Sequence, residues 1–283
     1  MTSTPVLENI APLASTSDVW FLDIWGVLHN GVRPFQSTVE ACKAFRHAGG
    51  IVILVSNSPR PREGVVRQLD QIGVERDAYD EAITSGDVSR NLIAKHPGET
   101  VWHLGPERDR PIFNGLDVVQ GTAETGRIIV CTGLFDDERE TPDDYKSRLR
   151  PLAGRGVEMI CANPDVKAER GGHMIYCAGA IAEAYEVMGG AVAYAGKPFA
   201  PIYEQAFALA ERLTGRTVGK DRVLAIGDGA GTDIEGACRA GVRSIYIASP
   251  VSLPRGTALA DAGEIVFGQR AAKPIAVMPA LVW

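Results

Sequence analysis

The sequence predicts an α/β protein with a doubly wound parallel sheet and a second, α+β segment inserted into it. Short continuous apolar runs, such as residues 51–55, alternate with segments in which apolar residues recur at helical spacing. Continuous apolar runs are typical of strands buried on both faces, as in parallel sheets covered by crossover helices. This alternation changes near residue 97 and resumes near residue 191, which indicates the insertion.

The first 97 residues read as three strands, each followed by a helix. A strand from Trp20 ends on Asp23, and the helix after it is expected to begin at a capping box formed by Ser37 and Glu40. Glycines at positions 49 and 50 end this helix. The remaining strands are expected at residues 51–55 and 82–84, and the remaining helices at residues 65–72 and 87–95.

The remainder of the chain supplies the insertion and the rest of the sheet. In the insertion, Thr141 is expected to cap a helix that has a proline at its first turn. Its other elements are expected at residues 101–104, 128–131, 157–161 and 179–188. The chain is then expected to return to the first sheet at residues 191–195, followed by a helix at 201–213, a strand at 223–226, a helix opened by Thr232 and a strand at 244–248. Residues 1–97 and 191–283 are therefore predicted to form the core, and residues 98–190 an inserted domain.

Composition excludes several classes of protein. The net charge of −6 argues against a nucleic-acid partner, which needs clustered Lys and Arg to neutralise phosphates. No apolar segment approaches the length that spans a bilayer, so no membrane partner is expected. Five cysteines are scattered singly, which suits a reduced, cytoplasmic protein better than a disulfide framework or a zinc site.

Polar residues follow the apolar strands at four places. Asp23, Asp228 and Asp233 would repel one another at a shared sheet edge unless a cation lay between them. Carboxylate oxygens are ligands for hard cations, and with a phosphorylated substrate Mg²⁺ is the natural choice. Lys197 can hold a carboxylate and a phosphoryl oxygen by charge, and Ser56 with nearby backbone N–H groups can hold another oxygen.

Four segments in order resemble the motifs of the haloacid dehalogenase-like hydrolases. They are Asp23-Ile-Trp25-Gly-Val, Val55-Ser56-Asn57, Gly196-Lys197-Pro198, and Gly227-Asp228 followed by Thr232-Asp233-Ile234. The long insertion between the second and third motifs resembles the IIA-capped branch of p-nitrophenyl, pyridoxal, nucleotide and sugar phosphatases. The resemblance implies a Rossmann-like core, and it implies that residues 98–190 form a cap over the active site.

The resemblance also implies roles for the motif residues. Asp23 would be the nucleophile that forms an aspartyl-phosphate, Ser56 and Lys197 would bind the transferred group, and Asp233 would support the metal shell or Lys197. The metal, Mg²⁺, would be held by Asp23, Asp228 and the backbone carbonyl of Trp25.

The cap is expected to contribute to substrate binding. Asn163-Pro-Asp165 resembles a segment of the IIA caps, so Asn163 and Asp165, with Asn57 of the second motif, are the candidates for substrate binding. Because family caps often mediate dimers, a homodimer through the cap is also expected.

Trp25 departs from the family pattern. The phosphatases carry a second Asp at this position, two residues after the nucleophile, whose side chain is the general acid and base. General acid–base catalysis is typically worth about 10²–10⁴-fold in rate. Either a surrogate such as His29, Asp165 or His173 supplies the proton, or the leaving group is a phenolate or acyl phosphate that needs little assistance, or turnover is poor.

The function expected is therefore a Mg²⁺-dependent phosphohydrolase acting on a small phosphorylated metabolite. The alternative is a catalytically weak or inactive relative that binds a phosphorylated ligand. Two other possibilities are more distant. One is carbon–halogen hydrolysis, because dehalogenases of the superfamily also have an aromatic residue in place of the second Asp. The other is dinucleotide binding at residues 227–231, whose glycine spacing fits the fingerprint only in part.

Overall fold

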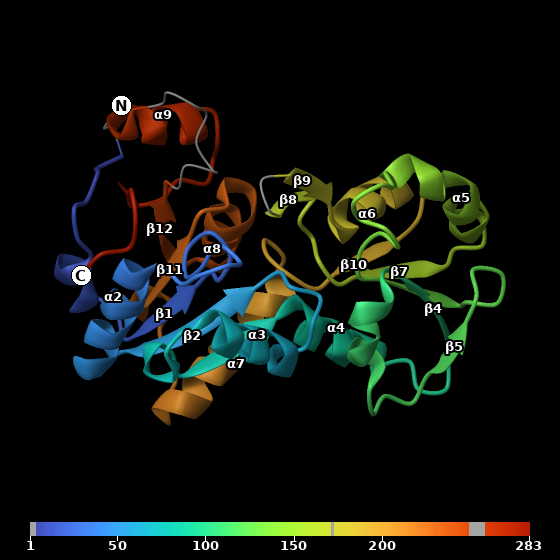
Figure 1. The fold of residues 1–283 in the computed structure, drawn as a ribbon, viewed down its shortest axis with the longest axis horizontal. Coiled ribbons are helices and arrows are strands. Elements are labelled where there is room, and N and C mark those ends of the chain that lie inside the picture. Colours follow the sequence, from blue (N-terminus) through green and yellow to red (C-terminus); the bar gives the residue numbers. More distant parts are fainter. Residues whose placement is uncertain (1–3, 171–172, 249–257) are drawn as a thin grey trace. The chain divides into compact units, whose positions relative to one another are not determined.

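The structure is a computed structural model that describes residues 4–170, 173–248 and 258–283. The chain forms two compact units, and each unit is made of chain segments that are separate in the sequence. The first unit consists of residues 1–56, 66–83 and 197–283, and the second consists of residues 57–65 and 84–196. Each unit is built around its own parallel sheet (Figure 1).

The first unit contains the doubly wound sheet that the sequence predicts. Its six strands lie in the order β13-β12-β11-β1-β2-β3. The strands are β1 (Val19–Leu22), β2 (Ile51–Ser56), β3 (Glu81–Thr84), β11 (Val223–Gly227), β12 (Arg243–Ile247) and β13 (Ala276–Met278). In β1 all four residues are buried, which is why this strand reads as a continuous apolar run.

The chain winds outward from β1 in both directions. It passes from β1 to β2 and β3 on one side, and later through β11, β12 and β13 on the other. Residue Leu22 of β1 lies in register with Leu54 of β2 and with Ile226 of β11. The point where such a sheet changes direction is where open α/β folds bind ligands, at the carboxyl ends of the strands. Here that point lies beyond β1 and β11, next to Asp23 and Asp228.

One helix, α1 (Ala11–Ala14), precedes the first strand. The helices that follow strands of this sheet or lead into them are α2 (Gln36–His47), α3 (Arg62–Ile72), α7 (Ala200–Thr214), α8 (Glu235–Ala240) and α9 (Ala262–Phe267). The predicted capping box of α2 is wrong. The N-cap is the extended Phe35, two residues before the predicted cap, so Ser37 lies inside the first turn of the helix. Glu40 instead accepts a hydrogen bond from Gln36 Nε2 at 2.8 Å. Glu40 therefore belongs to an i,i+4 side-chain pair on the helix surface and not to a capping box.

The second unit contains a five-stranded parallel sheet in the order β10-β7-β6-β4-β5, and a separate antiparallel hairpin of β8 and β9. The strands are β4 (Thr100–Leu104), β5 (Val119–Gly121), β6 (Ile128–Cys131), β7 (Glu158–Cys161), β8 (Lys167–Arg170), β9 (His173–Tyr176) and β10 (Val192–Tyr194). The strands expected at 101–104, 128–131 and 157–161 are confirmed. The strand expected to return to the first sheet at 191–195 is β10, which pairs with β7 in this second sheet, so that expectation is wrong.

The second unit begins before residue 98 and ends after residue 190. Its helices are α4 (Ser85–Ile93), α5 (Lys146–Gly154) and α6 (Ala178–Val187). Ile93 of α4 is fully buried against Val101 and Ile128, so this helix packs in the core of the second unit. The capping predicted at Thr141 is confirmed, because its hydroxyl and the Asp144 carboxylate form a reciprocal capping box at the 3₁₀ turn Pro142–Tyr145 before α5.

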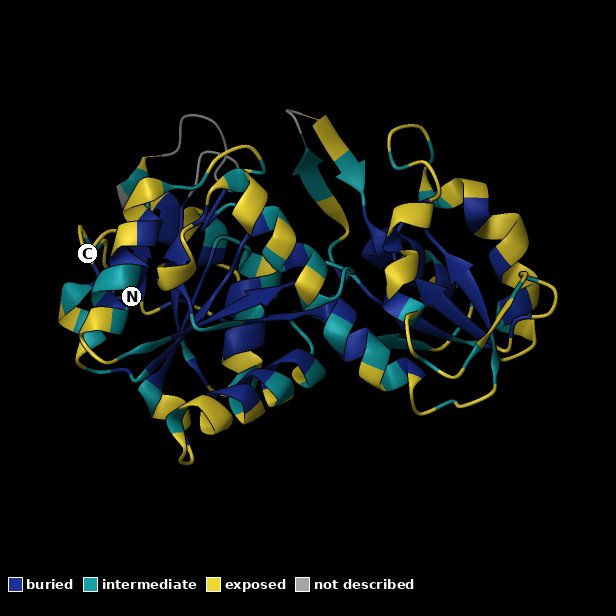
Figure 2. Ribbon diagram, turned by 60° about the horizontal axis from the view of Figure 1, so that its bottom comes forward, coloured by how far each residue is buried: buried dark blue, intermediate teal, exposed yellow. Residues whose placement is uncertain are grey.

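Burial follows the strands closely. Figure 2 shows most strands of the two parallel sheets as buried and the exposed residues mainly on helices and loops, and the exceptions are β5 and β10, whose residues are exposed or partly buried. Trp20 and Phe45 stack in the core of the first unit with ring centroids 3.9 Å apart. The five cysteines form no disulfide, and only Cys238 is exposed. Among the described residues, no helix combines the length and the apolar character needed to cross a membrane.

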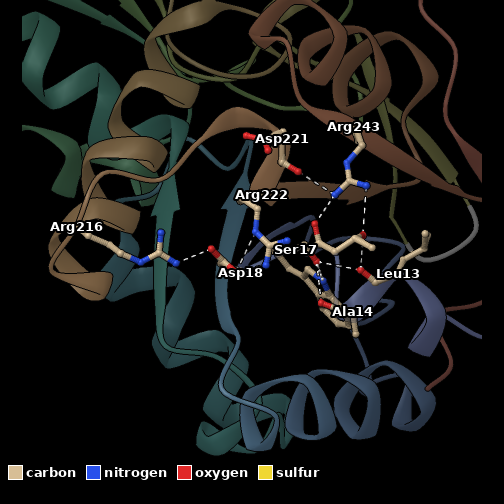
Figure 3. A network of polar contacts seen from close by, with 10 residues as sticks. Leu13, Ala14, Ser17, Asp18, Arg216, Asp221, Arg222 and Arg243 are labelled. Carbon is tan, nitrogen blue, oxygen red and sulfur yellow. Dashed lines mark hydrogen bonds and ion pairs between the residues drawn. The ribbon is translucent and has the colours of Figure 1, made fainter.

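The amino edge of the first sheet is closed by a network of arginines (Figure 3). Asp18, the residue before β1, accepts hydrogen bonds from Nη2 of Arg216 and from Nη2 of Arg222, each at 2.5 Å. Arg243, the first residue of β12, donates to the carbonyls of Thr16 and Asp221 at 2.7 and 2.9 Å. These contacts tie the starts of β1, β11 and β12 together.

Candidate active site

The nucleophile candidate lies where β1 ends. Its backbone N–H still donates to the carbonyl of Ile226 at 2.9 Å, so the sheet pairing fixes the main chain of Asp23. The Asp23 carboxylate is buried, and its Oδ1 accepts a hydrogen bond from Lys197 Nζ at 2.6 Å. The same ammonium donates to Asp233 Oδ1 at 2.7 Å. Residues 174 positions apart in the sequence thus meet at one point.

Three carboxylates crowd together beside the ammonium of Lys197. Burial opposes the charged form of Lys197, but the carboxylates of Asp23 and Asp233 outweigh it and raise the pKa of this ammonium above its usual range. Burial also raises the pKa of Asp23 well above its ordinary value, the carboxylates of Asp233 and Asp228 act in the same direction, and Lys197 opposes them. The carboxylates of Asp228 and Asp233 therefore repel that of Asp23, even though Lys197 bridges Asp23 and Asp233.

The three predicted carboxylates converge as the sequence analysis expected. Asp23, Asp228 and Asp233 each offer an oxygen, and these oxygens lie within 4.8 Å of one another. Gly26 makes room for Asp228, because a Cβ at residue 26 would lie 2.2 Å from Asp228 Oδ2. Gly26 has a φ of 83°, which also favours glycine. A side chain at position 26 would push Asp228 out of the cluster.

Asp233 is held by its own loop as well as by Lys197. Its Oδ2 accepts hydrogen bonds from the N–H of Gly229 at 3.1 Å and from the Thr232 hydroxyl at 3.3 Å. The helix predicted to open at Thr232 begins earlier, with a turn at Ala230–Ile234 that continues into α8. Because both oxygens of Asp233 are engaged, its position suits support of Lys197 better than direct binding of a metal.

The donor set fits a hard divalent cation. Carboxylate oxygens are the ligands that Mg²⁺ takes from proteins, usually one or two of them together with water and substrate oxygens. Asp23 and Asp228 each offer an oxygen to this cluster, and a divalent charge would reduce the repulsion among its carboxylates. The backbone carbonyl of Trp25, two residues from Asp23, is the third predicted ligand and stays a prediction.

Ser56 and Asn57 lie next to each other but belong to different units. Ser56 is the last residue of β2, the strand beside β1, and it is buried. Asn57 is buried at the start of the second unit, where its Nδ2 donates to Asp165 Oδ1 at 2.8 Å. The N–H of Asp165 in turn donates to Asn163 Oδ1 at 3.0 Å. The structure thus joins the three predicted substrate-binding residues in one hydrogen-bonded group.

The predicted surrogate acids differ in their surroundings. His29 is buried, which lowers its pKa to about 4. Its Nδ1 accepts a hydrogen bond from the N–H of Gly31 at 2.9 Å, so the ring is neutral at pH 7 and has no extra proton to donate. His173 is exposed on β9, and Asp165 accepts the bond from Asn57.

The role of His29 in holding the loop at Gly31 was missed by sequence reasoning. The only sequence signal was the glycine two residues after the histidine.

The comparisons with known proteins agree with this geometry. Family profiles match at residues 20–119, described as haloacid dehalogenase-like hydrolase, and at residues 194–267, described as HAD-hydrolase-like. A haloacid dehalogenase-like hydrolase from Brucella suis 1330 is 43% identical, with a TM-score of 0.88 and coverage of 98% of this chain and 100% of its own. This chain belongs to the haloacid dehalogenase-like hydrolase family. The resemblance stated from the motifs is thereby confirmed.

More distant members of this hydrolase family share the fold. A possible sugar phosphatase from Cytophaga hutchinsonii is 19% identical, with a TM-score of 0.81 and coverage of 99% of each chain. A glycerol phosphate phosphatase from Mycobacterium tuberculosis, solved in complex with magnesium, is 20% identical, with a TM-score of 0.70 and coverage of 96% of this chain and 77% of its own. A comparison with curated proteins gave no match.

Proposed function

We propose that this hydrolase is a Mg²⁺-dependent phosphatase that acts on a small phosphorylated metabolite through an aspartyl-phosphate on Asp23. The observation that carries the proposal is the ammonium of Lys197, which is buried between Asp23 and Asp233 beside Asp228. This arrangement keeps a carboxylate oriented next to a fixed positive charge. It suits attack on a phosphoryl group, whose oxygens need that charge.

Each step can be assigned to a residue of the chain. An oxygen of Asp23 forms a bond to phosphorus while the bond from phosphorus to the leaving oxygen breaks. Lys197 and the Ser56 hydroxyl bind the phosphoryl oxygens as negative charge shifts onto them. Water then attacks phosphorus and the bond from phosphorus to the Asp23 oxygen breaks, which regenerates the carboxylate. Phosphate leaves with the oxygen and one proton of the water, and the other proton passes to solvent. When bound at Asp23, Asp228 and the Trp25 carbonyl, Mg²⁺ would add charge stabilisation to both displacements.

The leaving group is the point at which Trp25 matters. An indole at position 25 donates no proton to the departing oxygen, and neutral His29 does not replace it. We therefore infer a substrate with a labile leaving group. The same observation favours a second candidate, a protein that binds a phosphorylated ligand and turns it over poorly.

Other predictions stay proposals. The second unit is proposed to act as the substrate-selecting cap, with Asn57, Asn163 and Asp165 in that role. The phosphatase relatives named above support a phosphorylated substrate and Mg²⁺. We also propose a cytoplasmic location, which the five unpaired cysteines support, and a homodimer through the cap, which the family resemblance supports.

The test is hydrolysis of p-nitrophenyl phosphate with Mg²⁺ in single and multiple turnover, for the wild type, Asp23→Asn and Trp25→Asp. Turnover by the wild type that is lost in Asp23→Asn supports the phosphatase. Negligible turnover by the wild type, restored in Trp25→Asp, supports the binding protein and identifies the missing acid as the cause.

A further inference from the structure

The loop after β1 holds Trp25 in a fixed position. The N–H of Gly26 donates to the carbonyl of His29, and the N–H of Leu28 donates to the carbonyl of Ile24, each at 2.9 Å. The loop closes on itself again where the N–H of Phe35 donates to the carbonyl of Leu28 at 2.9 Å. These bonds pair the backbone on both sides of the turn, so the main chain at Trp25 has little freedom.

The indole side chain has its own supports. A Cβ at Gly31 would lie 2.4 Å from Cη2 of Trp25, so the benzo end of the indole lies directly against this glycine. The His29 ring meets the indole edge to face, with centroids 5.4 Å apart and an interplanar angle of 80°. His29 is itself fixed by the hydrogen bond from Gly31. Gly31 and His29, two residues of the same turn, therefore both contact the indole of Trp25.

Trp25 nevertheless leaves 39% of its surface exposed. Gly31 and His29 cover part of the indole, and the rest of the ring offers an apolar face in a fixed orientation. Trp25 lies two residues after the nucleophile, so the two Cα atoms are within about 7 Å of each other. An indole anchored at this distance from the nucleophile is within reach of a group attached to the phosphorus.

We propose that the Trp25 indole binds an aromatic leaving group, which makes the substrate class aryl phosphates. The proposal rests on the phosphatase function above and names its substrate. Asp23 forms its bond to phosphorus while the bond from phosphorus to the aryl oxygen breaks, and the electron pair departs as a phenolate. A phenol has a pKa of about 10, so the phenolate leaves without a proton donor. Trp25, which stands where the general acid would be, thus binds a leaving group that departs without protonation.

His29 and Gly31 are positioning residues in this proposal. They touch the indole and act on the substrate only through it. Gly31 has a φ of 86°, and any side chain there would both strain the turn and displace the indole.

The experiment compares phenyl phosphate with acetyl phosphate, which has a good leaving group and no ring. Within each variant, the ratio of kcat/KM for phenyl phosphate to kcat/KM for acetyl phosphate is measured. In Trp25→Leu this ratio is expected to fall about tenfold, mainly through KM for phenyl phosphate, since an aromatic contact is lost. Trp25→Phe is expected to keep most of it. Val32→Ala is the control, because Val32 lies in the same loop and is 81% exposed.

The outcomes separate the two proposals. If the wild type hydrolyses both compounds and the ratio is the same in Trp25→Leu and Val32→Ala, the aromatic inference is overturned and the phosphatase stands. If the wild type hydrolyses neither, the phosphatase fails, and calorimetry with phenylphosphonate decides the rest. If Trp25→Leu binds phenylphosphonate about tenfold more weakly than the wild type, recognition of the ring by Trp25 is supported. If both bind it with equal affinity, that recognition is overturned.

Discussion

The two edges of the six-stranded sheet carry opposite charge arrangements. At the carboxyl edge, the ammonium of Lys197 is shared by the carboxylates of Asp23 and Asp233, and the carboxylate of Asp228 joins their cluster. At the amino edge, the single carboxylate of Asp18 is shared by the guanidinium groups of Arg216 and Arg222. The amino edge brings opposite charges together and holds strands in place. The carboxyl edge brings like charges together, which costs stability and suits a site for a cation and a phosphoryl group.

The largest effect is expected from Asp23→Asn, which removes the nucleophile. Loss of a nucleophile typically costs at least about 10⁴-fold in kcat. The substitution also removes one of three crowded carboxylates, so the melting temperature of the metal-free protein is expected to stay the same or rise. Phosphate release and thermal unfolding measured on the same preparation check both parts. A variant that lost activity together with stability would contradict the view that this edge is strained by its charge.

Lys197→Met is expected to have the next largest effect. It leaves buried carboxylates without their ammonium, and breaking a buried pair from one side costs about 3–5 kcal/mol in the free energy of unfolding. Urea denaturation at pH 8 without metal measures the loss. Lys220→Met serves as the control, because Lys220 is exposed in the same unit and its substitution should change little. Equal stability of the two variants would show that Lys197 does not offset the carboxylates.

Mg²⁺ is expected to stabilise the wild type through the carboxyl edge alone. A ligand at a hundred times its Kd adds about 2.7 kcal/mol to the free energy of unfolding. Asp228→Asn should lose most of this gain, whereas Asp18→Asn should keep all of it, since Asp18 lies at the other edge. Thermal unfolding with increasing Mg²⁺ measures the gain. A gain that survives Asp228→Asn would place the cation elsewhere.

The smallest effect is expected from Asp18→Asn, about 0.5–1 kcal/mol, because this ion pair is partly exposed to solvent. The hydrogen bond from Arg222 is the largest cause that lowers the pKa of Asp18 in the folded protein. Since the folded pKa is below the unfolded one, the stabilisation is fully present above the unfolded pKa and disappears as pH falls through the folded pKa. Urea denaturation of wild type and variant between pH 7 and pH 2 should therefore converge at the acid end.

The sequence predicted the buried strands of both units except β13, because the apolar runs of the others are continuous. It did not predict β5, β8 or β9. The strand β8 is Lys-Ala-Glu-Arg and has no buried residue, so neither its composition nor its periodicity favours a strand. β10 was expected as a strand but placed in the wrong sheet. Its three residues are only partly buried, and the choice of partner depends on β7, which is distant in sequence.

The candidate site was likewise predictable only in part. Asp23 and Asp228 could be placed together because each follows a buried parallel strand. Lys197 was expected at the same sheet edge because residues 191–195 were assigned to the first sheet. That assignment was wrong, since β10 pairs with β7, and the motif resemblance is what linked Lys197 to Asp23 correctly. The support of Trp25 by His29 and Gly31 could not be predicted, because it depends on how the loop folds back on itself.

The position of β1 between β11 and β2 has a consequence for synthesis of the chain. Val19 of β1 pairs with Val223 of β11, so one side of this apolar strand has no partner until more than 200 further residues are made. Every residue of the second unit is made before Lys197. During that interval β1 is an exposed sheet edge, which other chains can pair with. We therefore expect truncations before residue 223 to aggregate, even when the second unit is complete.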